Sequence, residues 1–201
     1  MSGYGSQPIA QYTISRGFFH KAWDITINGQ TVYHVDNSHW TPGKPDLTFH
    51  AGPNTTGPIA GVSKYRHFSS DTEIGLGDPA QAHAIEWFCL NRDSRMSVRY
   101  SIRMSIGSDH QPRTFTWKRT RSLGSSRHSG DLKLVDDSDR ILAVLSSGGS
   151  FSSTSGQMNI YAQYGDRFQL MVLVSGLALR EKLARARKAA AASAGGGGGG
   201  A

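Results

Sequence analysis

The chain has 201 residues, a mass of 21.8 kDa, a formal net charge of +7 and one cysteine, Cys89, and this length suits a single domain. One cysteine cannot close an intramolecular disulfide, and residues 1–11 hold neither a basic leader nor an apolar segment, so we expect an intracellular protein and not a secreted, disulfide-stabilised one. The longest apolar run, residues 168–179, falls short of the roughly 20 residues that a membrane-spanning helix needs.

Short segments of alternating apolar and polar residues follow one another along most of the chain, which is the pattern of β-strands. The clearest signal is a hairpin of residues 24–27 and 30–35 around Asn28-Gly29, because both turn residues tolerate the positive φ of a type I′ turn. Pro, Gly and Asp clusters separate the segments. About twelve strands are predicted in all, the others being residues 12–15, 47–50, 59–64, 72–76, 85–90, 97–104, 114–119, 132–135, 141–145 and 158–163.

One helix is predicted near the C-terminus, over about residues 166–188. Asp166 is the expected N-cap, with Gln169 at the capping-box position. Residues 168–179 are apolar on all sides and not along one stripe, so this segment must be surrounded by protein. Residues 1–10 are expected to be flexible and residues 189–201 to be disordered. The cations that follow the apolar segment are expected to lie outside the core: Arg180, Lys182, Arg185, Arg187 and Lys188.

A fully enclosed helix decides the fold class, because a β-sandwich has no room for it. A closed antiparallel barrel of about twelve strands is wide enough to hold a central helix. Twelve helical residues span about 18 Å, which is close to the height of tilted strands of six to eight residues. We therefore predict a mainly β domain over residues 11–188, a barrel that encloses the C-terminal helix.

This pattern resembles the tubby C-terminal-like superfamily, which includes tubby proteins, LURP-one-related proteins and phospholipid scramblases, over about residues 12–187. The most similar segments are residues 113–120, RTFTWKRT, as in small fungal members, and residues 166–179, DRFQLMVLVSGLAL. Tubby proteins bind phosphoinositides through basic residues on neighbouring strands, so the resemblance implies lipid binding. The scramblase calcium motif and proline-rich leader have no counterpart here, so calcium binding and lipid flipping are not implied.

The positive charge is concentrated in two segments. Residues 92–128 have a net charge of +7 and residues 180–201 of +4, whereas the other two parts of the chain are each at −2. If residues 107–112 join two strands symmetrically, Lys118 lies opposite Ser101, with Arg99 and Arg103 as diagonal neighbours and no carboxylate among them. Such a cluster suits a multiply charged phosphate headgroup. The predicted ligand-binding residues are Arg99, Arg103, Lys118, Arg119 and Arg121.

We expect a non-enzymatic module without a cofactor that attaches reversibly to anionic membrane lipid, in the cytoplasm, at a membrane or in the nucleus. The alternative is a nucleic-acid-associated protein or a protein-interaction scaffold with a solvated basic face, although the sequence has no DNA-reading helix or RNA-stacking motif. An enzyme is not expected, because the sequence lacks a nucleophile elbow. A metal site is not expected either, since one cysteine cannot form the thiolate cluster of a zinc finger and no two of the eight histidines have HExxH spacing.

Overall fold

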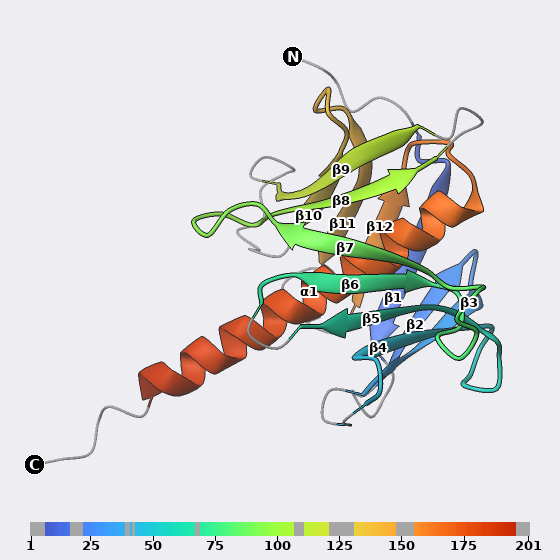
Figure 1. Ribbon diagram of the computed structural model, residues 1–201, viewed down its shortest axis with the longest axis horizontal. Coiled ribbons are helices and arrows are strands. Elements are labelled where there is room, and N and C mark those ends of the chain that lie inside the picture. The colour runs from blue at the N-terminus through green and yellow to red at the C-terminus, as the bar shows by residue number, and fades with distance from the viewer. Residues whose placement is uncertain are drawn as a thin grey trace, which may run out of the picture.

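In the residues that it describes, the structure, a computed structural model, contains twelve strands and one helix (Figure 1). It describes residues 7–16, 22–38, 41, 43–66, 69–106, 111–120, 131–147 and 155–195. The strands are β1 (Ala10–Arg16), β2 (Ala22–Ile27), β3 (Gln30–Asn37), β4 (Leu47–Ala51), β5 (Ile59–Tyr65), β6 (Thr72–Leu76), β7 (Glu86–Arg92), β8 (Arg99–Ser105), β9 (Pro112–Arg119), β10 (Leu132–Val135), β11 (Ile141–Ser147) and β12 (Ser155–Ile160), and the helix is α1 (Asp166–Gly195).

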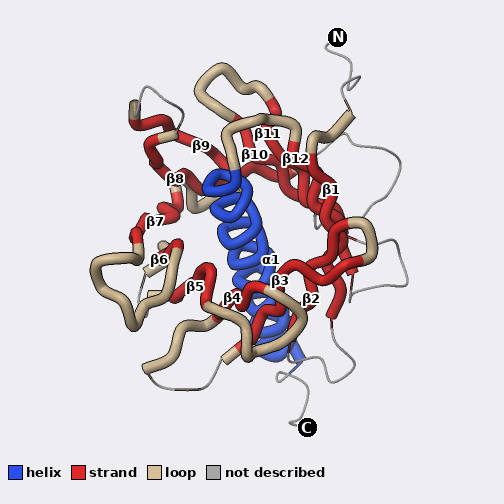
Figure 2. The backbone as a smooth tube through the Cα atoms, turned by 90° about the vertical axis from the view of Figure 1, so that its right-hand side faces the viewer, coloured by secondary structure: helices blue, strands red, loops and turns tan. Residues whose placement is uncertain are grey.

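The strands form a closed barrel in which each strand pairs antiparallel with its neighbours along the chain. β1 closes the barrel against β12, from Ala10 opposite Ile160 to Ser15 opposite Ser155. Figure 2 shows α1 running through the middle of the ring of strands. The predicted fold, a closed antiparallel barrel around a hydrophobic C-terminal helix, is therefore confirmed.

Each of the predicted strands is present, with ends that differ by a few residues. The hairpin between β2 and β3 turns at Asn28 and Gly29, whose φ angles of 51° and 79° are both positive. Ile27 and Gln30 pair directly across this turn. These are the features of the type I′ turn that the dipeptide predicted.

The core is the contact between α1 and the inward-facing side chains of the strands. Phe168 and every residue from Met171 to Leu179 are buried. Trp117 on β9 is fully buried, and its Nε1 donates a hydrogen bond to Ser175 Oγ at 3.0 Å. Gly176 allows this close approach, because a Cβ there would lie 3.1 Å from the Trp117 ring and 2.7 Å from Met158 Cε.

The helix begins differently from the prediction. Gly165, with a φ of 83°, is the N-cap, because its carbonyl accepts the first helical hydrogen bond, from Gln169 N at 3.2 Å. The Gln169 side chain accepts a hydrogen bond from the Tyr12 hydroxyl at 2.7 Å. The predicted capping box is therefore wrong, and Asp166 lies in the first turn, where its negative charge is favourable to the helix dipole.

The helix is also longer than predicted. It continues to Gly195, so residues 189–195 are helical and the prediction of disorder there is wrong. Alanine has the highest intrinsic helix propensity, and the run Ala189–Ala192 therefore extends a helix that is already anchored in the barrel. Residues 1–6 and 196–201 lie outside the described residues, whereas Ile9 N already donates to Ile160 O at 2.8 Å.

Candidate functional site

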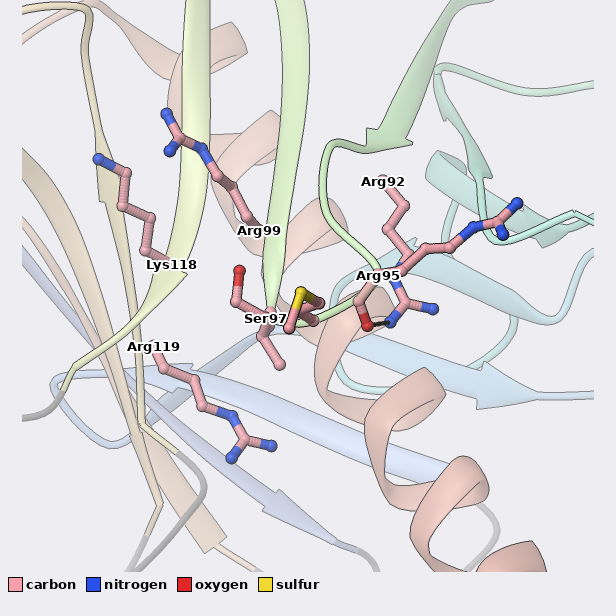
Figure 3. A pocket seen from close by; sticks show the side chains of 8 residues that line it. Arg92, Arg95, Ser97, Arg99, Lys118 and Arg119 are labelled. Carbon is pink, nitrogen blue, oxygen red and sulfur yellow. Dashed lines mark hydrogen bonds between the residues drawn. The ribbon is translucent and has the colours of Figure 1, made fainter.

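A hollow of about 420 Å³ lies beside the hairpin between β7 and β8, and we call it the basic pocket. It lies at the end of the barrel from which α1 emerges: Asp71 accepts a hydrogen bond from Arg92 N at 2.9 Å, and its carbonyl accepts one from Lys182 Nζ on α1 at 2.9 Å. The described residues that line the pocket include five cations and no carboxylate. They are Arg92, Arg95, Met96, Ser97, Val98, Arg99, Lys118 and Arg119 (Figure 3).

Three cations form a row across neighbouring strands. Arg99 on β8 lies directly opposite Lys118 on β9, and Lys118 lies directly opposite Lys133 on β10. In Figure 3 the side chains of Arg99 and Lys118 extend side by side in the same direction. Like charges placed opposite each other destabilise a sheet, so this row carries an electrostatic cost that a bound anion would relieve.

The register of β8 and β9 differs from the prediction by two residues. Ser105 pairs with Pro112, which places Arg99 and not Ser101 opposite Lys118. Arg103 lies opposite Thr114, away from the pocket. A shift of two residues keeps every side chain on its face of the sheet, so the alternating pattern cannot distinguish the two registers.

One carboxylate contacts the row of cations, contrary to the prediction of none. Asp139, in the turn between β10 and β11, forms an ion pair with Lys118 Nζ. The hydrogen bond from Lys118 and its positive charge, followed by the charges of Lys133 and Arg99, hold the pKa of Asp139 below its ordinary value. Because 68% of the Asp139 side chain is exposed, this ion pair is open to competition from a dissolved anion.

The β7–β8 hairpin is held in shape by its own hydrogen bonds. Arg92 Nε donates to Ser94 O at 2.8 Å, and Arg92 Nη2 donates to Arg95 O at 3.1 Å. Ser94 Oγ accepts from the backbone N–H groups of Met96 and Ser97, both at 3.2 Å. Arg92 therefore stabilises the turn, and the side chains that remain for a ligand are those of the other four cations in the pocket.

Three guanidinium groups at the pocket have no partner within the described residues. No hydrogen bond or ion pair joins the side chains of Arg95, Arg99 and Arg119 to any residue the structure describes. Arg119 pairs with Leu132, whose side chain is buried, so Arg119 is on the inner face of the sheet. In Figure 3 its side chain extends in the direction opposite to that of Lys118.

The structure brings three of the five predicted ligand-binding residues together, namely Arg99, Lys118 and Arg119. Arg103 is on the outer wall outside the pocket, and Arg121 lies outside the described residues. The sequence prediction missed Arg92 and Arg95. Both belong to the basic segment 92–128, but Arg92 is the last residue of β7, beyond the predicted strand 85–90, and Arg95 lies in the turn that follows. The alternation along the predicted strands therefore includes neither residue.

The prediction that all the cations of the second basic segment lie outside the core is wrong. Lys182 Nζ donates to Asp71 O at 2.9 Å and Thr72 Oγ1 at 3.1 Å. Arg185 donates to Asp46 Oδ1 and Asn37 Oδ1, both at 2.9 Å. These contacts hold α1 where it leaves the barrel, so these cations are not available to a ligand.

A buried carboxylate completes this region, which we call the exit collar and define as Arg16, Asn37, Asp46, Glu181, Lys182 and Arg185. Glu181 is only 5% exposed, and it accepts hydrogen bonds from Arg16 at 2.9 Å and Asn37 at 3.2 Å.

The neighbouring Arg180 is half-buried, with its guanidinium 4.9 Å from the centroid of the Trp23 ring. Desolvation lowers the pKa of both Arg180 and Lys182. Of the five cations of this segment, Arg187 and Lys188 are exposed as predicted.

Other kinds of site find little support in the described part of the chain. No three His, Cys, Asp or Glu side chains there are grouped to hold a metal ion. Side chains of these types do form a pair on the outer wall, where His34 Nδ1 lies 2.7 Å from Asp24 Oδ1. Burial raises the pKa of the Cys89 thiol, which lowers its fraction of reactive thiolate.

Two further findings bear on function. Among the described residues there is no helix with the length and hydrophobicity required to cross a bilayer. Compared with protein-family models, with curated proteins and with solved structures, the chain has no match.

Proposed function

We propose that this protein is a non-enzymatic module that attaches reversibly to anionic membrane lipid, with a phosphoinositide-like headgroup bound in the basic pocket. The observation that carries the proposal is the row in which Arg99 and Lys118 lie directly opposite each other beside a 420 Å³ hollow. Arg95 and Arg119 extend the positive charge around that hollow. Arginine binds phosphate oxygens in a fork and lysine adds a point charge, so the set suits a ligand with several phosphate charges.

The size of the pocket favours a single headgroup over a nucleic acid. Neighbouring strands lie about 4.8 Å apart, so the row from Arg99 to Lys133 extends over only about 10 Å. Binding of single-stranded nucleic acid usually combines a longer basic groove with aromatic side chains that stack on bases. Among the lining residues that the structure describes, none has an aromatic side chain.

The fold supports the same ligand class. A barrel closed around a hydrophobic helix is what the resemblance to the tubby C-terminal-like superfamily implies, and membership of that superfamily is part of this proposal. Each basic residue near an anionic leaflet contributes about 1 kcal/mol, so the four cations Arg95, Arg99, Lys118 and Arg119 together give an affinity that is moderate and sensitive to salt. Such binding is reversible without any chemical step.

Charge reversal at the row tests the proposal. We expect the double variant Arg99→Glu and Lys118→Glu to bind vesicles of phosphatidylcholine and phosphatidylinositol bisphosphate at least about tenfold more weakly than the wild type. Its affinity should also depend less steeply on salt. Cosedimentation over a salt series measures both. The matched control is Lys44→Glu, an exposed lysine between β3 and β4, which should change binding by less than about twofold.

Unchanged vesicle binding in the double variant would contradict the proposed site. The same protein preparations are titrated with duplex and single-stranded oligonucleotides at low salt. Tighter binding to an oligonucleotide than to vesicles, with a steep salt dependence, would favour the nucleic-acid alternative and reject the lipid proposal.

Removing the competing carboxylate should have the opposite effect. Asp139→Asn releases Lys118 from its ion pair, and we expect affinity for the same vesicles to rise about threefold. Asp137→Asn is the matched control, because Asp137 is exposed in the same turn and removes the same charge without freeing Lys118. Equal gains in the two variants would show that only net charge matters and that the ion pair does not regulate the pocket.

A further inference from the structure

Two large apolar side chains are exposed near the cations of β8 and β9: Met96 lines the basic pocket, and Trp87 lies toward the opposite end of β7. Trp87 on β7 is 41% exposed, and Met96 at the tip of the β7–β8 hairpin is 100% exposed. Among the described residues the other large hydrophobic side chain exposed to this degree is Ile9, near the start of β1. Exposed apolar area of this kind, next to segregated charge, marks an interaction surface.

From this arrangement we propose that the barrel lies side-on against an anionic bilayer, with Trp87 and Met96 entering the boundary between headgroups and acyl chains. The inference rests on the proposed function, and it adds the orientation of the protein and the residues that contact the lipid interior. The surface consists of the outer wall of β7, β8 and β9 together with the tip of the β7–β8 hairpin, and we call it the docking wall.

The Trp87 indole is held on the outside of the barrel. Gly75 on β6 lies directly opposite Trp87, and a Cβ at Gly75 would approach the indole to 3.0 Å and Val62 to 2.8 Å. The absence of a side chain at Gly75 therefore lets the indole pack against the wall. Lys64 Nζ lies 5.0 Å from the ring centroid, which places a cation over the aromatic face.

The surroundings of Trp87 suit the headgroup layer of a membrane. Trp87 lines a second hollow of about 500 Å³ together with Lys64, Arg66, Glu73, Phe88 and Cys89. Within the described residues the Trp87 indole N–H has no hydrogen-bond acceptor, so it is able to donate to a lipid phosphate or ester oxygen. Tryptophan is enriched at membrane interfaces because it combines an apolar ring with one polar donor.

Met96 is presented by a turn that is already ordered. The hydrogen bonds of Arg92 and Ser94 described above fix the hairpin backbone on both sides of Met96. Insertion of Met96 into lipid therefore requires little further ordering of the chain, and a preorganised contact loses less entropy on binding.

The cations and the apolar side chains share one face of the sheet. Trp87 and Asn91 both point outward on β7, and Asn91 pairs with Ser101 on β8. Arg99 and Arg103 are each two residues from Ser101 on β8, so their side chains also point outward. Lys118 joins them from β9, opposite Arg99. The wall thus offers cations for headgroups between two apolar contacts.

The carboxylates near this wall are largely engaged by the protein itself. Glu73 forms an ion pair with Arg66 at 2.7 Å, and Asp93 accepts a hydrogen bond from the Ser101 hydroxyl at 2.7 Å. Figure 1 shows β7, β8 and β9 as one face, with the β7–β8 hairpin projecting beyond the barrel on the side where α1 also emerges. Docking on this face leaves the projecting end of α1 beside the bilayer and not directed into it.

A bilayer explains this combination better than a free phosphate compound. A soluble inositol phosphate would fill the basic pocket, but it would leave Trp87 in water and offer no hydrocarbon to the Met96 side chain. Only a ligand that presents anionic groups and hydrocarbon together contacts all of the exposed groups, and a membrane surface has that composition.

The test combines binding with the fluorescence of Trp87. The chain has three other tryptophans, Trp23, Trp40 and Trp117, and subtracting the emission of the Trp87→Phe variant removes their signal and isolates that of Trp87. On addition of vesicles of phosphatidylcholine and phosphatidylinositol bisphosphate, we expect Trp87 emission to shift to shorter wavelength and to be quenched by lipids brominated near the headgroup end of the acyl chain. Vesicles of phosphatidylcholine alone should produce neither change.

Substitution of the two apolar side chains should separate the bilayer from the headgroup. We expect the double variant Trp87→Ser and Met96→Ser to bind these vesicles about tenfold more weakly. The single variant Trp87→Ser leaves the residues that line the basic pocket unchanged, so it should also bind vesicles more weakly but keep the affinity of the wild type for soluble inositol trisphosphate. Ile9→Ser is the matched control and should change vesicle binding by less than about twofold. Circular dichroism checks that each variant is folded, which the exposure of all three side chains favours.

The outcomes distinguish the inference from the function on which it rests. If the wild type binds vesicles but Trp87 is not quenched, or if the double serine variant binds them equally well, side-on insertion is wrong and headgroup binding stands. If the wild type binds neither vesicles nor inositol trisphosphate, the proposed function is wrong and the inference falls with it.

Discussion

Replacing Trp117 by alanine is expected to lower the free energy of unfolding by about 3–5 kcal/mol. Trp117 is fully buried between the barrel wall and α1, and its indole lies against Gly176. The variant therefore leaves a cavity in the centre of the barrel, and it removes the donor that binds Ser175 Oγ at 3.0 Å. Urea unfolding followed by circular dichroism at the helix signal measures the change.

Trp87→Ala provides the matched comparison, because it removes the same side chain from the outer wall, where Trp87 is 41% exposed. We expect it to cost less than about 1.5 kcal/mol. A loss at Trp117 no larger than the loss at Trp87 would mean that α1 does not fill the barrel in solution, and the fold described above would be wrong.

Replacing Glu181 by alanine is expected to cost about 3–5 kcal/mol, because it removes one partner of a buried ion pair. Glu181 is 5% exposed and accepts hydrogen bonds from Arg16 and Asn37. Without the carboxylate, the positive charges of Arg16 and the half-buried Arg180 repel each other, which destabilises the folded state. Thermal unfolding and urea unfolding of the same samples measure the loss.

Two variants bracket this result. Glu181→Gln keeps an oxygen that accepts from Asn37 but removes the charge, so its loss should be smaller than that of the alanine variant. Glu73→Ala breaks the Arg66–Glu73 ion pair on the surface, where the side chains are 52% and 34% exposed, and should cost less than about 1 kcal/mol. A Glu181→Ala protein as stable as Glu73→Ala would show that the exit collar does not fix the helix.

The fold could be predicted because each strand has one face against α1 and the other toward water. This arrangement produces alternation of period two along the chain, as in β9, where buried Phe115 and Trp117 alternate with less buried neighbours. The uniformly apolar segment of α1 required enclosure on all sides, and Asn28-Gly29 indicated a specific turn. These signals are local, so they can be read without knowledge of the tertiary structure.

The site could be predicted only in part, because its geometry depends on contacts between distant residues. Lys118 is on β9 and Asp139 follows β10, so the pairing of β9 with β10 brings the two residues together, and no local pattern indicates their ion pair. The contacts of the exit collar, such as that between Glu181 and Arg16, join the two ends of the domain. The register of β8 and β9 was missed for a different reason, since shifts of two residues leave the alternation unchanged.

The helix that fills the barrel follows all twelve strands along the chain, and this order has a consequence for biosynthesis. During translation the inward faces of the strands leave the ribosome before the segment that will cover them, and β1 must wait for β12 to close the ring. Pairing between such distant segments is slow, and exposed apolar strands are prone to aggregate. The apolar faces of the strands therefore stay uncovered until α1, the last element of the barrel, has left the ribosome.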